Sequence, residues 1–363
     1  PTGARTPPRR SAGVWATSRD ATALPAPPGA IRRPRAGTDE RPPLTGSPDA
    51  AAGRLLTPGR IRDIARALGV RPSKARGQNF VHDPGTVRRI VRDAGVRPGD
   101  AVVEIGPGLG SLTLALLEAG AFVSAVEVDP RLAAALLPTV RARMPEAAGR
   151  AAVAAMDAMR IAGAQDLAVP PAFESPLGPT GPFLPAKLVA NLPYNLAVPL
   201  LLTLFDTLPC AETATVMVQA EVADRLAAAP GSRTYGAPSA KVAWYSDARR
   251  GAKIGRSVFW PVPNVDSALV SFIRHPPPSC VSRDEVFAVV DAAFAQRRKT
   301  LRSALAAWAG SPARAEGALR SAGIDPALRG ERLRIEDFAA IAAAGRGEAM
   351  KFTASRDDGM PVN

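Results

Sequence analysis

The sequence is poor in the residues that form disulfides and metal sites. Its 363 residues contain two cysteines and two histidines, and Cys210 and Cys280 have no cysteine or histidine partners at metal-ligand spacing. The sequence therefore indicates neither a zinc site nor a disulfide framework. Such a composition fits a protein of the reducing cytoplasm, and we expect the protein there.

Long apolar runs are also missing. No run reaches the ~18 apolar residues of a membrane span, and the most apolar stretch, residues 187–205, is interrupted by Asn191, Pro193, Asn195 and Pro199. We expect no membrane segment. Because 46% of the residues are hydrophobic, the chain can still bury a sizeable core.

Negative charge is scarce, since 33 acidic residues stand against 46 basic ones and the net charge is +13. An excess of this size suits a surface that binds a polyanion. It also suits a solvated, arginine-rich surface, because only six of the basic residues are lysine. Charge alone leaves both interpretations open.

Residues 1–56 are rich in Pro, Arg, Ala and Gly and have no sustained apolar period, so we expect a disordered extension. An Arg-rich start also resembles an organelle transit peptide, but the prolines argue against the amphipathic helix that such peptides form. At Thr57 the pattern changes. Thr57 and Pro58 can begin a helix with an apolar face, and Asp83-Pro84 can begin a second.

Strands and helices then alternate in the rhythm of a parallel, doubly wound sheet. Residues 162–185 hold six prolines and suggest a surface loop. The predicted strands are 101–105, 122–128, 151–155, 188–190, 213–219 and 268–273, and the predicted helices are 112–118, 131–140, 200–206 and 222–228.

The prolines at 276–278 mark a linker, after which only helices are predicted, at 284–294, 300–308, 313–322 and 335–344. We therefore expect an α/β domain over residues 57–275, a small all-helical domain over 276–348, and a flexible tail over 349–363.

Three glycines, Gly106, Gly108 and Gly110, directly follow a buried strand and precede a helix. Glycine lets the backbone approach a ligand closely and frees amides at a helix N-terminus. The spacing suits a dinucleotide or a tight turn as well. Glu104, just before the loop, differs from the apolar run usual in dehydrogenases and favours a methyl donor over NAD.

Carboxylates follow the next strands at positions where they can contact a nucleoside. Glu127 stands about 20 residues beyond the glycines, where an acid accepts from ribose hydroxyls. We expect Asp129 to cap the helix that starts at Pro130. Asp157 can accept from the amino group of an adenine ring or can cap a helix.

The most informative segment is Asn191-Leu192-Pro193-Tyr194, directly after the predicted strand 188–190. An adenine N6 is a poor nucleophile because its lone pair is conjugated into the ring. The side-chain oxygen of Asn191 and a main-chain carbonyl of Leu192 or Pro193 can accept both N–H protons and aim the lone pair at a methyl group. Tyr194 would stack on the flipped base. A plain turn after a strand is the alternative.

These motifs, with others along residues 60–345, resemble those of the KsgA rRNA adenine dimethyltransferases. The further segments are Gly77–Val81, Gln219–Leu226, Tyr235-Gly236, Pro261–Ala268 and Phe294–Arg302. The resemblance implies a Rossmann-like class I methyltransferase sheet with a helical C-terminal domain. It implies transfer of four methyls from S-adenosylmethionine to two adjacent adenosines near the 3′ end of small-subunit rRNA, on a pre-30S particle during ribosome biogenesis.

Carried over position by position, the resemblance assigns roles to individual residues. The donor site would use Asn79, Val81, Gly106, Gly108, Glu127, Asp157 and Asn191, and the catalytic segment would be Asn191, Leu192, Pro193 and Tyr194. We expect the cluster Arg297-Arg298-Lys299 to lie in a C-terminal helix and to contact rRNA phosphates. The chain departs from the family pattern at His82, where an Asn is common, and in residues 195–199.

Two other functions remain open. An Erm-type methyltransferase of large-subunit rRNA would share the donor site and the Asn-x-Pro-aromatic motif, whereas the segments 261–268 and 296–300 favour the small-subunit enzyme. A non-catalytic assembly factor would bind pre-ribosomal RNA only, and Asn191 and Tyr194 argue against it. We expect a monomer.

Overall fold

The computed structural model describes residues 53–72, 78–178, 180–193, 196–278 and 281–357. Tyr194 and the expected N-terminal extension up to residue 52 lie outside the described residues. The described residues all belong to one compact unit of the chain.

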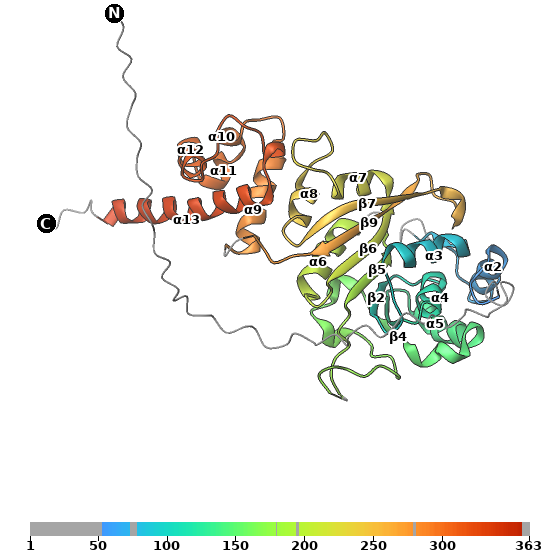
Figure 1. Cartoon of the computed structure of the whole chain (residues 1–363). Coiled ribbons are helices and arrows are strands. Elements are labelled where there is room, and N and C mark those ends of the chain that lie inside the picture. Colours follow the sequence, from blue (N-terminus) through green and yellow to red (C-terminus); the bar gives the residue numbers. More distant parts are fainter. Residues whose placement is uncertain (1–52, 73–77, 179, 194–195, 279–280, 358–363) are drawn as a thin grey trace, which may run out of the picture. The chain divides into compact units, whose positions relative to one another are not determined.

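A seven-stranded sheet forms the centre of the fold, with the strand order β4-β3-β2-β5-β6-β9-β7 (Figure 1). Strands β2 to β6 run parallel, and β9 is antiparallel to both of its neighbours, β6 and β7. The strands are β2 (Ala101–Ile105), β3 (Phe122–Glu127), β4 (Ala151–Ala155), β5 (Lys187–Asn191), β6 (Thr213–Gln219), β7 (Ser246–Ile254) and β9 (Ser267–Arg274). The expected doubly wound α/β sheet is confirmed.

Helices cover both faces of this sheet, because successive strand residues point to opposite sides. Val103 packs into a first hydrophobic cluster and Val102 into a second. The first cluster contains residues of α6 (Ala197–Thr207), α7 (Ala220–Leu226) and α8 (Ala237–Val242), and the second those of α2 (Pro58–Ala67), α3 (Pro84–Asp93), α4 (Ser111–Glu118) and α5 (Pro130–Arg143).

Side-chain caps fix where two of these helices begin. The Asp83 carboxylate accepts from the amide of Thr86 at the start of α3, and the Asp129 carboxylate accepts from the amide of Arg131 at the start of α5. The predicted capping role of Asp129 is confirmed. Proline follows each cap, where its missing N–H costs nothing.

The elements that the sequence analysis missed include helix α8 and the long strand β7. β7 is an edge strand whose exposed residues include Arg249, Arg250 and Lys253. Its register against β9 shifts between Arg250 and Lys253. Charged side chains and a bulge are how natural edge strands avoid pairing with other chains, and both features hide the alternating apolar pattern.

A two-stranded antiparallel sheet, β1 (Phe80–Val81) with β8 (Phe259–Trp260), holds the segment before α3. The rings of Phe80 and Trp260 stack with their centroids 6.3 Å apart. This pairing fixes residues 78–81, which belong to the candidate site.

The C-terminal part is helical, as expected, and consists of α9 (Arg283–Ala295), α10 (Leu301–Ala304), α11 (Ala306–Ala309), α12 (Pro312–Ser321) and α13 (Ile335–Asp357). The last helix is longer than expected, because α13 continues into residues 349–357, which the sequence analysis assigned to the tail. One expectation was wrong. Arg297, Arg298 and Lys299 lie not in a helix but in the turn between α9 and α10, because the backbone leaves the helical conformation at Gln296.

The C-terminal helices share a core with the sheet. Val286, Val290 and Phe338 belong to the same hydrophobic cluster as Val216 of β6 and Phe272 of β9. Packing also reaches further toward the N-terminus than expected, because Leu55 and Leu56, assigned above to the extension, are buried in the second cluster.

The proline-rich segment 162–185 contains no strand and no helix beyond a 3₁₀ turn at Ala164–Asp166 among its described residues. It is anchored by aromatic side chains. Phe183 is fully buried, and its ring centroid lies 4.7 Å from that of Phe173, which in turn contacts Phe122. No described helix is both long and apolar enough to cross a membrane.

Because one core joins sheet and helices, Phe338→Ala should destabilise both together. The side chain is fully buried, so the cavity should cost about 3–5 kcal/mol of the free energy of unfolding. Urea denaturation followed by circular dichroism should show one transition at a lower midpoint. Val262→Ala, at a residue that is 62% exposed, serves as the control and should change stability by less than about 0.5 kcal/mol. A separate early transition in Phe338→Ala would contradict the shared core.

Candidate active site

The site lies where the order of the strands reverses. β2 pairs with β3 on one side and with β5 on the other, and the connections leave in opposite directions. In open parallel sheets such a point leaves a crevice outside the carboxyl ends of the strands. The register places Ile105, Val126 and Ala190 beside one another at this edge.

The glycine loop forms the floor of this crevice. Gly106 and Gly108 have φ angles of 69° and 57°, a region that side chains with a Cβ avoid. A Cβ on Gly108 would also stand 2.8 Å from the ring of Phe80. The loop therefore requires glycine both for its backbone conformation and for the close approach of residue 80.

Glu127, at the end of β3, is held by main-chain amides. One of its carboxylate oxygens accepts from the amide of Gly108 at 3.1 Å and the other from that of Asp129 at 2.9 Å. The side chain is buried, and burial raises its pKa above the ordinary value, against the opposing effect of these hydrogen bonds. The two oxygens have four lone pairs between them, so the carboxylate can still accept from a ligand hydroxyl.

Glu104, at the end of β2, is the second buried carboxyl group of the pocket, and the sequence analysis did not count it as a site residue. It is 1% exposed, and its Oε2 accepts a 2.6 Å hydrogen bond from the Thr113 hydroxyl. Burial raises its pKa to about 8, the Thr113 hydroxyl opposes the rise and the charge of Glu127 adds to it.

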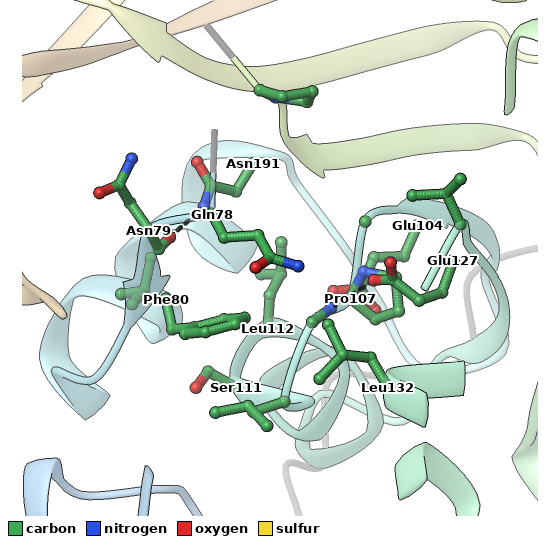
Figure 2. Close-up of a pocket in the computed structure, with 16 residues that line it drawn as sticks. Gln78, Asn79, Phe80, Glu104, Pro107, Ser111, Leu112, Glu127, Leu132 and Asn191 are labelled. Atoms are coloured by element: carbon green, nitrogen blue, oxygen red, sulfur yellow. Dashed lines mark hydrogen bonds between the residues drawn. The ribbon is translucent and has the colours of Figure 1, made fainter. Parts of the chain in front are cut away.

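Asn191, at the end of β5, is oriented by the segment 78–81. Its Nδ2 donates to the main-chain carbonyl of Asn79 at 3.1 Å, as Figure 2 shows. A carbonyl can only accept, so the amide nitrogen must face Asn79. The Oδ1 atom therefore points the other way and can accept a hydrogen bond from a ligand.

The residues after Asn191 have different surroundings. Leu192 is buried in the core, and its amide donates to the Met217 carbonyl of β6. Pro193 lines the pocket, and its carbonyl accepts from the amide of Leu196 at 3.2 Å, which leaves one lone pair. The stacking role of Tyr194 stays a prediction, because this residue lies outside the described residues.

The pocket gathers most of the predicted donor-site residues, which are Asn79, Val81, Gly106, Gly108, Glu127 and Asn191. Asp157 does not line it. Its carboxylate accepts from the Met159 amide and caps the 3₁₀ helix Ala158–Arg160 beyond β4. Its contact with an adenine ring stays a prediction.

Further lining residues are Gln78, Phe80, Glu104, Pro107, Leu109, Ser111, Leu112, Val128, Leu132 and Pro193 (Figure 2). The positions of Glu104 and Ser111 beside the glycine loop could have identified both as pocket residues from the sequence. Leu112 and Leu132 gave no such signal, because apolar residues near helix N-termini are common in any core.

The groups that line the pocket fit a nucleoside with a charged amino-acid tail better than they fit a metal ion. Glu127 offers acceptors for a ribose, Leu112, Leu132 and Val128 offer apolar surface for a base, and helix α4 points its N-terminus at the loop. The Ser111 hydroxyl is buried and has no hydrogen-bond partner among the described residues. No metal-binding group of three or more His, Cys, Asp or Glu occurs in the part of the chain that the structure describes.

Comparison with known proteins identifies the family. The sequence model of the ribosomal RNA adenine dimethylase family matches residues 71–344 of this chain. The chain belongs to this family. S-adenosylmethionine is therefore its cofactor, and its activity is that of an S-adenosylmethionine-dependent rRNA adenine dimethyltransferase.

Similar proteins include the ribosomal RNA small subunit methyltransferases A of Thermobifida fusca and Streptomyces avermitilis. The first is 61% identical over 295 residues, which are 81% of this chain and 97% of that protein. The second is 60% identical over 298 residues, which are 82% of this chain and 94% of that protein.

Two solved structures share the fold of this dimethylase. A dimethyladenosine transferase from Plasmodium falciparum matches with a TM-score of 0.58 and 23% identity, over 74% of this chain and 98% of that one. The 23S rRNA methyltransferase ErmE matches with a TM-score of 0.51 and 24% identity, over 74% and 100%. The expected class I methyltransferase sheet with C-terminal helices is confirmed.

The raised pKa of Glu104 predicts a pH dependence of stability. Between its ordinary pKa of 4.5 and about 8, the folded protein holds a proton that the unfolded chain has lost. Stability should therefore fall as the pH rises through this window, by up to about 1.4 kcal/mol per pH unit. Glu104→Gln keeps the acceptor for Thr113 but cannot titrate, so its free energy of unfolding should fall less steeply. Urea titrations from pH 5 to 9 measure both proteins, and parallel curves would refute the assignment.

The unpartnered hydroxyl of Ser111 predicts a contact with the donor. Ser111→Ala should weaken S-adenosylmethionine binding about five- to tenfold, the value of one hydrogen bond, and should not destabilise the donor-free protein. Calorimetric titration measures the affinity. Ser124→Ala is the matched control, because the Ser124 hydroxyl is also buried and has no hydrogen-bond partner in the described part of the chain, but it does not line the pocket. Equal affinities of wild type and Ser111→Ala would exclude the contact.

Proposed function

We propose that this chain transfers methyl groups from S-adenosylmethionine to N6 of two adjacent adenosines near the 3′ end of small-subunit rRNA, four methyls in all. The proposal is supported by the names of the curated relatives, which cover 81% and 82% of this chain. The pocket chemistry supports it independently.

The orientation of Asn191 carries the proposal. A site that methylates an exocyclic amine must accept hydrogen bonds from the N–H groups of that amine. The hydrogen bond from Asn191 Nδ2 to Asn79 leaves Oδ1 facing the pocket as such an acceptor. The same pocket contains the glycine loop and Glu127, so the acceptor stands beside the donor site. A mere RNA-binding protein has no need of this combination.

The reaction needs no strong base. When Asn191 Oδ1 and a main-chain carbonyl of Leu192 or Pro193 accept the two N–H groups, the nitrogen lone pair is directed out of the ring plane. With S-adenosylmethionine bound, the lone pair would form the new N–C bond as the S–C bond of the sulfonium breaks. The methylated nitrogen then loses its proton to water. Alignment of this kind can contribute several of the roughly 7–11 kcal/mol available from orientation.

We further propose that Arg298 and Lys299 contact rRNA phosphates on a pre-30S particle. Both side chains are exposed, as a contact with RNA requires. We also infer that the protein acts as a monomer in the cytoplasm, where small subunits are assembled.

The competing functions differ in substrate or in chemistry. A methyltransferase of large-subunit rRNA has the same fold, since ErmE matches it, so fold alone does not distinguish the two. A non-catalytic assembly factor would bind the particle without consuming the donor. Incubation with labelled donor and either small-subunit particles or large-subunit rRNA, followed by primer extension, separates all three. The proposal requires paired stops at neighbouring adenosines of the small-subunit rRNA.

Asn191→Ala should abolish methyl transfer, by at least about 1000-fold, because the amine loses the acceptor that exposes its lone pair. Binding to small-subunit particles should stay within a few-fold of wild type. Filter binding measures the second quantity and incorporation of labelled methyl the first. Undiminished incorporation by the variant would remove Asn191 from the catalytic site.

A further inference from the structure

The three cations of the turn 296–299 differ in what they contact. Arg298 and Lys299 extend into solvent, whereas Arg297 makes two specific contacts. Its Nε donates to Glu331 Oε2 at 3.0 Å, and its Nη2 donates to the main-chain carbonyl of Arg233 at 2.7 Å. One guanidinium therefore joins three segments that are far apart in the sequence.

Two of these segments also bind each other directly. The amide of Gly231 donates to the carbonyl of Glu331 at 2.6 Å, and the buried Tyr235 hydroxyl donates to the carbonyl of Leu333 at 2.9 Å. Residues 231–236 follow α7, which packs on β6, and residues 331–333 lead into α13. These contacts tie a loop of the catalytic sheet to the C-terminal helices.

The backbones at this junction approach closely. A Cβ on Gly330 would stand 3.0 Å from that of Ala293 in α9, and one on Gly231 would stand 3.2 Å from Arg332 Nη1. Gly231 also has a φ angle of 82°, which favours glycine. The segments at this junction are thus closely packed, and their backbones have little room to shift.

The charges of the junction are uneven. Segments 231–236, 296–300 and 328–333 contain six cations and a single carboxylate, Glu331. Apart from Arg297, the cations form what we call the basic surface, all exposed: Arg233, Arg298, Lys299, Arg329 and Arg332. A carboxylate among them weakens attraction for phosphate, so its presence calls for another role. Holding Arg297 is the role that its contacts indicate.

Stability alone does not explain this pair. The Arg297 and Glu331 side chains are 43% and 29% exposed, and ion pairs of such exposure contribute about 0–1 kcal/mol. Geometry explains it better. The planar guanidinium can hold a carboxylate and a carbonyl at once in fixed directions, which the single ammonium of lysine does not reproduce.

We propose that Arg297 is a positioning residue rather than a phosphate contact. Together with Glu331 it fixes the basic surface relative to the donor pocket, so that RNA held on this surface presents its adenosine to Asn191. The inference rests on the proposed function, because it takes rRNA as the substrate. It divides the cluster 297–299 into one residue that orients and two that bind phosphate.

Charge-preserving and charge-removing variants test this division. Arg297→Lys keeps the charge, and Glu331→Gln increases the net positive charge. If Arg297 bound phosphate, both variants should bind RNA as tightly as wild type or more tightly and should turn over normally. The positioning role predicts that both variants lower kcat about five- to tenfold on small-subunit particles, since slight misplacement of bound groups costs up to about 100-fold. Their KM and the slope of log Kd against log salt should stay near wild type. Arg298→Ala should instead raise Kd and reduce that slope by about one.

The chain offers a matched control pair. Arg302 Nε and Glu316 Oε2 are 2.8 Å apart, with side chains 51% and 31% exposed, and they join α10 to α12 only. Glu316→Gln removes the same charge as Glu331→Gln and should leave kcat unchanged. Normal kcat in Arg297→Lys and Glu331→Gln would overturn the inference, as would equal losses in Glu316→Gln.

A measurement that needs no RNA separates the positioning role of Arg297 from the proposed function on small-subunit rRNA. If the wild type itself methylates no small-subunit rRNA, the proposed function fails and turnover cannot report on Arg297. Hydrogen exchange at the Gly231 amide, which donates to Glu331, then decides whether Arg297 holds the junction. Exchange should accelerate several-fold in Arg297→Lys and not in Arg298→Ala, and equal exchange in both would overturn the inference.

Discussion

The hydrogen bond between the Asn191 carboxamide and the Asn79 carbonyl is the constraint on which the site depends. It joins two residues that are 112 positions apart in the chain, and it decides which end of the carboxamide faces a substrate. Without it the carboxamide could turn and present a donor to an amine that must itself donate. The fold keeps Asn79 in place through the pairing of β1 with β8, so a small two-stranded sheet serves the chemistry of the large one.

Burial of charge is the second theme of the pocket. Glu104 and Glu127 end neighbouring parallel strands, and each would be costly to bury without its hydrogen bonds. Their partners differ: Glu127 accepts from the main-chain amides of Gly108 and Asp129, whereas Glu104 accepts from the Thr113 hydroxyl and is the more deeply buried of the two. The first is thereby suited to stay an acceptor, and the second keeps its proton near neutral pH. Two carboxyl groups of one type thus acquire distinct properties from their surroundings.

The C-terminal helices pack tightly against the catalytic sheet, although the three prolines at 276–278 suggested a linker between separate domains. A common hydrophobic cluster and the junction at Glu331 both tie them to the sheet. Such an arrangement suits an enzyme that must hold a large RNA at one surface and treat a single base at another.

The sequence by itself determined the alternation of strands and helices, the glycine loop, the acid at Glu127 and the importance of Asn191. These follow from local rules, because periodicity, turn chemistry and motif spacing act between near neighbours in the chain. It did not reveal β7, since an edge strand with Arg249 and Arg250 lacks an apolar period, nor the turn that carries Arg297. Only the tertiary structure decided the orientation of Asn191, the protonation of Glu104 and the partners of Arg297. Each of these depends on groups brought together by folding from distant segments, and no local pattern encodes such distances.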